Sequence, residues 1–283
     1  MVSKRMIDLV TVVFKDELPI LKVQAESVDL YCKELGIKTI FVIVNDADSV
    51  ADQIDPAWWG SLSNCVKIIP RSFFKYDFVE NGWVSQQVLK VLASALSTNQ
   101  FSMILDAKTI FVKPATLNLL LPDGKMAGGL YKIQEVFSTS ARIVGELFNV
   151  VVDRNGGLSG VPFIFNTNDI HGMIAEIEHR TKDSFPNWFQ DQGMVTEYIL
   201  YVGYCIYRYG NLDKIYSLTV PYQVANLCHS QTGIIPNKLL EMAGSCSLTV
   251  SVHRRAWTVM TQEQQHVYKQ LLINRGIKTA ESL

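Results

Sequence analysis

The sequence predicts an α/β fold built on a mixed but mostly parallel sheet, with helices against its faces. Three runs rich in apolar and β-branched residues, at 7–14, 39–44 and 66–70, predict strands, and the run at 39–44 is expected to be buried. Between the first two runs, apolar residues recur at helical spacing over 18–35, and Gly36 follows as a helix stop. Strand, helix and strand in alternation indicate parallel strands joined by right-handed crossovers.

The stretch 101–114 supplies the expected centre of the sheet. Its apolar run Met103–Leu105 stops at Asp106 and is too short for an independent helix, so it predicts a buried strand. In open α/β sheets the ligand crevice lies just outside the carboxyl ends of the strands. Asp106 is therefore a candidate ligand-binding residue, and the alternative is an ordinary turn aspartate.

Two other predicted strands also end in polar clusters. Lys15 and Asp16 follow the first strand, and Asn45 and Asp46 follow the second. Such clusters suit hydrogen bonding to a nucleobase and a ribose, although turns use the same residue types for local reasons.

A helix is expected after the breaker Asn81-Gly82, because residues 84, 88, 91, 92 and 95 are apolar. Gln86 and Lys90 are four residues apart on this helix and share a face. Since the helix leads into the Asp106 strand, Lys90 is expected beside the same crevice. The alternative is a solvated surface lysine.

The rest of the chain continues this mixed pattern. We first expect an apolar strand at 110–112, a strand with a glycine bend at 125–131 and a helix over 138–148, followed by a flexible glycine-rich stretch at 155–160 that lacks the context of a dinucleotide fingerprint. A strand at 161–165 and a helix over 170–180, capped by Asn166–Asp169, come next. We then expect an aromatic-rich segment at 188–209 with Asp191 and Glu197 at the start of a further helix, a strand at 248–252 that ends in His253-Arg254-Arg255, and a terminal helix over 261–275. No repeat, linker or low-complexity segment divides the chain. We therefore expect one domain over 1–283, with a nucleotide-binding half at about 1–115 and an acceptor-binding half at about 116–283.

Composition excludes several classes of protein. The 283 residues are 48% hydrophobic, which is enough for a sizeable core. The net charge of −1 lacks the excess of positive charge expected of a protein that binds a nucleic-acid polymer. No apolar run approaches a transmembrane span, and residues 1–7 lack the apolar centre of a signal peptide. The five cysteines are scattered without a CxxC pair, which favours reduced thiols, a cytoplasmic location and no zinc site.

Four short motifs, in this order, resemble a known enzyme class. They are Gly82-Trp83 with Gln86-Gln87 and Lys90; Leu105-Asp106-Ala107-Lys108-Thr109-Ile110-Phe111; Thr196-Glu197-Tyr198 with Leu200-Tyr201; and His253-Arg254. Together they resemble GT-A-type nucleotide-sugar glycosyltransferases, and more narrowly a poorly characterised group of bacterial and viral glycosyltransferase-like proteins. The resemblance covers nearly the whole chain and implies a Rossmann-like mixed sheet.

The resemblance also implies a diphosphate site, from which this chain departs. The family strand usually ends Asp-x-Asp, whose carboxylates hold a divalent metal against the donor diphosphate, whereas here the third position is Lys108. Three outcomes stay open. Asp106 and His253 hold Mn²⁺ or Mg²⁺; the Lys108 ammonium, with Arg254 or Arg255, neutralises the diphosphate without metal; or activity has been lost.

The resemblance places the acceptor base at the start of a helix. Glu197 matches that position and Asp191 is the nearby alternative, whereas a structural reading makes Glu197 a helix N-terminal acid stabilised by the dipole. The residues expected at the donor are Lys15, Asn45, Asp46, Gln86, Lys90, Asp106, Lys108, Arg254 and Arg255.

Three functions remain in view. The first is transfer of a sugar from a nucleotide-sugar donor to a carbohydrate or glycoconjugate acceptor, as in polysaccharide biosynthesis. The second is an inactive relative that binds nucleotide-sugar or glycan. A nucleotidyltransferase is less well supported, because residues 15–19 are not the basic glycine-rich loop expected after its first strand.

Overall fold

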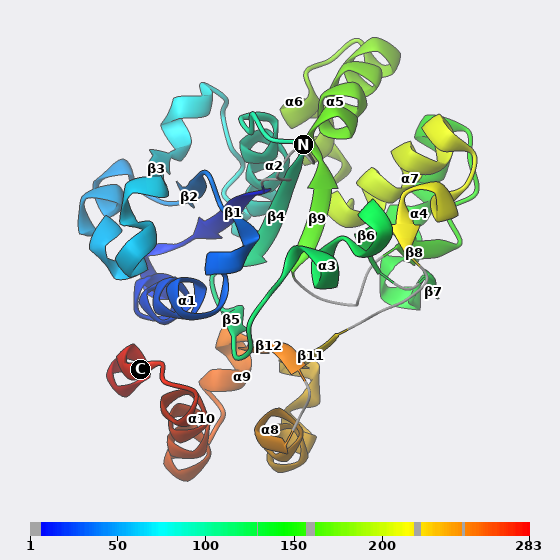
Figure 1. Cartoon of the computed structure of the whole chain (residues 1–283). Helices are drawn as coiled ribbons and strands as arrows, with labels where there is room; N and C mark the ends of the chain where they lie inside the picture. Colours follow the sequence, from blue (N-terminus) through cyan, green and yellow to red (C-terminus); the bar gives the residue numbers. More distant parts are fainter. Residues whose placement is uncertain (1–6, 129, 157–161, 218–221, 245–246) are drawn as a thin grey trace.

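A five-stranded sheet forms the centre of the molecule (Figure 1). The computed structural model describes residues 7–128, 130–156, 162–217, 222–244 and 247–283. In spatial order, the strands are β3 (Val66–Pro70), β2 (Ile40–Val44), β1 (Ile7–Val13), β4 (Phe101–Asp106) and β9 (Phe163–Asn166). The first four are parallel and β9 runs antiparallel to β4. The mixed, mostly parallel sheet that the sequence predicts is therefore confirmed.

Two helices fix which strand ends lie together. Helix α1 (Leu18–Tyr31) connects β1 to β2, and α2 (Gly82–Ala95) connects β3 to β4. The two connections run in opposite directions across the sheet, so right-handed crossovers place α1 and α2 on opposite faces. The direction reverses between β1 and β4, which pair with Val12 opposite Asp106. Such a switch point is where open α/β sheets bind ligands.

Four further helices and two separate two-stranded sheets lie around β9 and α2 (Figure 1). The helices are α4 (Ser138–Phe148), α5 (Thr167–Thr181), α6 (Phe185–Gln192) and α7 (Glu197–Tyr209). Strand β6 (Met126–Ala127) pairs with β10 (Tyr216–Ser217), and β7 (Leu130–Lys132) pairs with β8 (Arg154–Gly156). The short helix α3 (Leu117–Leu120) precedes all of these elements in the chain. Polar caps define helix starts: Asn81 accepts from the N–H of Trp83, and Asn166 caps α5 as the sequence predicts.

Two sequence expectations need correction in this region. The single strand predicted at 125–131 is two short strands in different sheets, because β6 pairs with β10 and β7 with β8. Asp191 does not start a helix with Glu197: it lies near the end of α6, and Gly193 turns the chain at φ 65° before α7 begins. Of the glycine-rich stretch predicted at 155–160, residues 155 and 156 belong to β8, and residues 157–160 lie outside the described residues. Residue 161 of the predicted strand also lies outside them, as do residues 1–6 of the segment 1–7 that lacks the pattern of a signal peptide.

The C-terminal elements build a second apolar core beside α1 (Figure 1). They comprise β11 (Gln223–Leu227), α8 (Ile235–Gly244), β12 (Ser247–Val252), α9 (Arg254–Trp257) and α10 (Gln262–Asn274), with β5 (Ile110–Phe111) antiparallel to β12. The core includes Val23 of α1 and Ile110 of β5, so the late strand and the early chain share one interior. A boundary near residue 115 stays a prediction. Among the described helices, none is long and apolar enough to cross a membrane.

Candidate active site

The turn after β4 is fixed by α1. The N–H of Thr109 donates to the carbonyl of Asp106 at 2.8 Å, which closes the turn. The buried amide of Gln24 then donates to the carbonyl oxygens of Asp106 and Thr109, at 2.6 and 3.1 Å. Because both ends of the turn are tied to α1, Asp106 and the residues after it have fixed directions at the switch point.

A buried lysine joins the donor candidate Asp106 to the base candidate Glu197. The Lys90 ammonium lies 2.7 Å from Asp106 Oδ1 and 2.9 Å from Glu197 Oε1. It also donates to the Tyr198 hydroxyl at 3.3 Å. An ammonium has three N–H donors, and these three acceptors match them. Its side chain is 5% exposed, so Lys90 lies inside the wall of the site and is not the solvated surface lysine that the sequence left open.

A second lysine occupies the other Asp106 oxygen. Lys108 Nζ lies 2.7 Å from Asp106 Oδ2, and its side chain is 25% exposed. Gln86 contributes a longer bond of 3.4 Å to Oδ1. The cluster is thus a row of alternating charges, in the order Glu197, Lys90, Asp106 and Lys108, from the buried end to the exposed end.

The pairing keeps Asp106 and Lys90 charged. Burial opposes ionisation of Asp106, but the adjacent Lys108 and Lys90 ammoniums hold the pKa of this carboxyl well below its usual range. Burial likewise opposes the charge on Lys90, but the Asp106 and Glu197 carboxylates hold the pKa of Lys90 well above its usual range. Asp106 and Lys90 are therefore an ion pair throughout the neutral range.

Backbone and side chains at the end of β1 lie beside this row. The N–H of Lys15 donates to Asp46 Oδ2 at 3.1 Å, which links the ends of β1 and β2. Arg254 of α9 donates to Asp16 at 3.2 Å, so the C-terminal sheet meets the end of β1. The structure therefore brings several of the predicted donor residues to one edge.

Glu17 also belongs to this edge, and sequence reasoning did not select it. Burial raises the pKa of Glu17, and the Phe14 N–H and the Lys108 ammonium oppose that shift. The signal was available, because Glu17 directly follows the polar pair Lys15-Asp16 at the end of the first strand.

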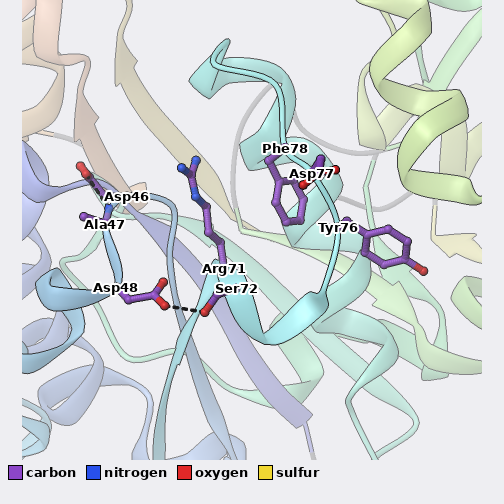
Figure 2. A pocket seen from close by; sticks show the side chains of 8 residues that line it. All are labelled: Asp46, Ala47, Asp48, Arg71, Ser72, Tyr76, Asp77 and Phe78. Atoms are coloured by element: carbon purple, nitrogen blue, oxygen red, sulfur yellow. Dashed lines mark hydrogen bonds between the residues drawn. The ribbon is translucent and has the colours of Figure 1, made fainter.

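A pocket of about 330 Å³ opens at the carboxyl ends of β2 and β3 (Figure 2). It is lined by Asp46, Ala47, Asp48, Arg71, Ser72, Tyr76, Asp77 and Phe78. Asp48 accepts a 2.6 Å hydrogen bond from Ser72, and Figure 2 shows Arg71 between the acidic loop and the segment of Tyr76 to Phe78. Of these residues the sequence selected only Asp46. Arg71 follows the third strand directly, so the strand-end argument would have found it there as well.

Four predicted residues have other surroundings. Asn45 is buried and its amide donates to the Ser85 hydroxyl at 2.9 Å and to the Gly82 carbonyl at 3.3 Å, so it joins β2 to the start of α2. Asp191 is exposed on α6, and no contact found among the described residues joins it to the charged row. His253 Nδ1 accepts the N–H of Arg255 at 3.2 Å and caps α9, with Arg255 exposed.

The donor set does not fit the divalent metal that the family resemblance implies. Mn²⁺ and Mg²⁺ need several oxygen ligands. Both oxygens of Asp106 are bound to lysine ammoniums, and His253 is used as a helix cap. Within the described ranges, no group of three or more His, Cys, Asp or Glu side chains is placed to hold a metal ion.

Comparisons with known proteins give similarities over most of the chain. No curated protein matches it. A solved structure of the galactosyltransferase LgtC, in complex with donor and acceptor sugar analogs, is 12% identical, with 93% of this chain and 95% of that chain covered and a TM-score of 0.49. An active-site mutant of LgtC is 13% identical, with 94% and 95% covered and a TM-score of 0.44. A family model matches residues 7–234, so the chain belongs to DUF6492, a family of unknown function.

Proposed function

We propose that the protein is a glycosyltransferase that moves a sugar from a nucleotide-sugar donor to a carbohydrate or glycoconjugate acceptor. The observation that carries this proposal is the charged row around Asp106 at the β1–β4 switch point. Ligands of open α/β sheets bind at that place. A turn aspartate with no other role would not need two lysines, one of them buried, on its two oxygens.

The adjacent pocket is the proposed site of the donor nucleoside. Asp46 and Asp48 offer carboxylate oxygens to ribose hydroxyls, as the acidic residue after the second strand does in dinucleotide-binding folds. Tyr76 and Phe78 supply aromatic rings on the other side of Arg71 (Figure 2). Asp46 connects this pocket to the end of β1 through the Lys15 N–H. In the proposed binding mode, the diphosphate extends from the nucleoside across that strand end to Lys108.

The proposed reaction exchanges one bond for another at the anomeric carbon of the donor sugar. The bond from that carbon to the diphosphate oxygen breaks, and the nucleoside diphosphate leaves with the electron pair. A new bond forms from the same carbon to the acceptor hydroxyl oxygen, whose proton passes to a carboxylate base. Cations beside the leaving diphosphate stabilise the charge that builds there. Glu197 is the proposed base, because it shares Lys90 with Asp106, and Asp191 is the alternative.

One observation favours the second candidate function, a non-catalytic domain that binds nucleotide-sugar or glycan. The Glu197 side chain is only 2% exposed and is paired with Lys90. A general base must come within hydrogen-bond distance of the acceptor hydroxyl. If Glu197 stays buried when ligands bind, the site binds a donor without transferring its sugar.

A hydrolysis and transfer screen distinguishes these functions. The full chain is incubated with a panel of nucleotide-sugars, and released nucleoside diphosphate is measured alongside binding by calorimetry. We expect release from at least one donor, loss of that release in Asp106→Asn, and retention in Asp123→Asn, which alters an exposed aspartate outside the charged row. Binding without release supports the non-catalytic domain, and neither binding nor release refutes both functions.

A further inference from the structure

Lys108 is the exposed end of the charged row and has a fixed position. The turn from Asp106 to Thr109 is closed by a backbone hydrogen bond and tied to α1 through Gln24. Asp106 Oδ2 then holds the Lys108 ammonium at 2.7 Å. A lysine usually has a long flexible stem, but here both its backbone and its charged group are held.

The two lysines on Asp106 differ in the donors they leave for a ligand. Lys90 meets three acceptors, namely Asp106, Glu197 and Tyr198, and is 5% exposed. Lys108 is 25% exposed, and within the described part of the chain its one hydrogen-bond acceptor is Asp106. Because an ammonium has three N–H donors, Lys108 has two left for oxygen atoms that approach from the crevice.

An anion that enters this crevice therefore meets an ammonium where the family resemblance leads one to expect a metal ion. A divalent cation would have to displace one lysine from Asp106 and would be repelled by the other. A diphosphate group has the opposite charge and several acceptor oxygens, and it needs no such displacement.

We propose that Lys108 is the resident cation of the donor site and binds the diphosphate group directly, with no divalent ion between them. Asp106 is then a positioning residue that aims Lys108, and Lys90 anchors Asp106 from inside. This inference rests on the proposed function for the identity of the ligand as a nucleoside diphosphate, but its test uses binding and does not require turnover.

The first test measures binding of inorganic pyrophosphate to the full chain by calorimetry, once with EDTA and once with MnCl₂. We expect binding in EDTA, with less than about a threefold change in Kd on adding Mn²⁺. Lys108→Gln should weaken binding at least about tenfold, the worth of one charge-assisted contact, and Lys108→Arg should retain most of it.

Lys238 provides a matched control. Its side chain is 21% exposed and its ammonium pairs with Glu241 at 2.6 Å, so it resembles Lys108 in exposure and pairing but lies on α8. Lys238→Gln should leave pyrophosphate binding unchanged. Thermal melts of all variants show whether each one folds. If Lys108→Gln does not fold, Lys108→Arg still tests the proposal, because a folded variant that keeps the positive charge should keep binding pyrophosphate in EDTA.

The outcomes separate this inference from the proposed function. Pyrophosphate binding that requires Mn²⁺, that persists in Lys108→Gln, or that is absent in both buffers overturns the resident cation. Sugar transfer that depends on Mn²⁺ would keep the function and refute the inference. Lys108-dependent binding in EDTA, without turnover of any nucleotide-sugar, would keep the inference and refute the function.

Discussion

Lys90 offers the sharpest test of the charged row, because Lys108 provides an internal comparison. Both ammoniums lie 2.7 Å from an oxygen of Asp106, but the Lys90 side chain is 5% exposed and that of Lys108 is 25% exposed. At an effective dielectric constant of 20, the Lys90 contacts of 2.7 and 2.9 Å are each worth about 6 kcal/mol of Coulomb energy before desolvation is subtracted. Removing one member of a buried ion pair costs roughly 3–5 kcal/mol, because the partner charge stays buried.

We therefore expect Lys90→Met to lower the free energy of unfolding by about 3–5 kcal/mol, a fall in Tm of roughly 6–10 °C for a chain of this size. Lys108→Met should cost only about 1 kcal/mol, the upper end of the range for exposed pairs, because this pair is half-buried and Lys108 can reach solvent. Urea denaturation followed by tryptophan fluorescence measures both. The double variant with Lys90→Met and Glu197→Gln should lose less free energy of unfolding than the sum of the losses in the two single variants, by at least about 1 kcal/mol.

Two results would refute this reasoning. If Lys90→Met costs no more than Lys108→Met, burial does not set the importance of the Asp106 contacts. If the Lys90 and Glu197 changes are additive within about 0.5 kcal/mol, the two groups do not interact, and the row is not one unit.

Three further predictions concern separate parts of the molecule. Glu197→Gln should lower kcat for sugar transfer by about 10²–10⁴-fold, with Asp191→Asn changing it less than about threefold; the reverse order would assign the base to Asp191. Asp46→Ala should weaken binding of the preferred nucleoside diphosphate about tenfold in calorimetry, and unchanged Kd would remove the nucleoside from that pocket. Gly203→Ala should destabilise the protein by about 1–3 kcal/mol in urea denaturation, because the new methyl group would overlap Val144 of α4; a cost below about 0.5 kcal/mol would contradict that packing.

The central sheet could be predicted because its strands are mainly apolar. Strands buried on both faces need no polar alternation, so runs such as Ile40–Val44 stand out from the surrounding sequence. The short strands could not be predicted in the same way. Met126–Ala127 and Leu130–Lys132 carry no pattern of their own, and their pairing depends on residues far along the chain.

Parts of the charged row were predictable because strand ends and helix faces place residues at known edges. Asp106, Lys90 and Gln86 were selected on those grounds and meet in the structure. The sequence could not show that Lys90 points inward to Glu197, since a lysine four residues after Gln86 reads equally well as a surface residue. Nor could it show that Asn45 turns toward α2, because hydrogen bonds between distant segments leave no local signal.

The pocket was largely missed for a related reason. Its residues come from two loops that follow different strands, and only the packing of those strands side by side brings Asp48 to Ser72. The departure from the metal-binding motif, in contrast, could be identified from the sequence. The sequence identified Lys108 as the departure from the family pattern, and the structure adds that this lysine binds the same aspartate that a metal would need.

The position of a bound nucleoside diphosphate tests the central claim most directly. Crystals of the full chain soaked with the preferred nucleoside diphosphate, in buffer containing EDTA, would show it by X-ray diffraction. The account predicts the nucleoside in the pocket between Asp46 and Phe78, and a phosphate oxygen about 3 Å from Lys108 Nζ. A nucleotide bound away from the β1–β4 switch point, or a diphosphate that makes no contact with Lys108, would contradict it.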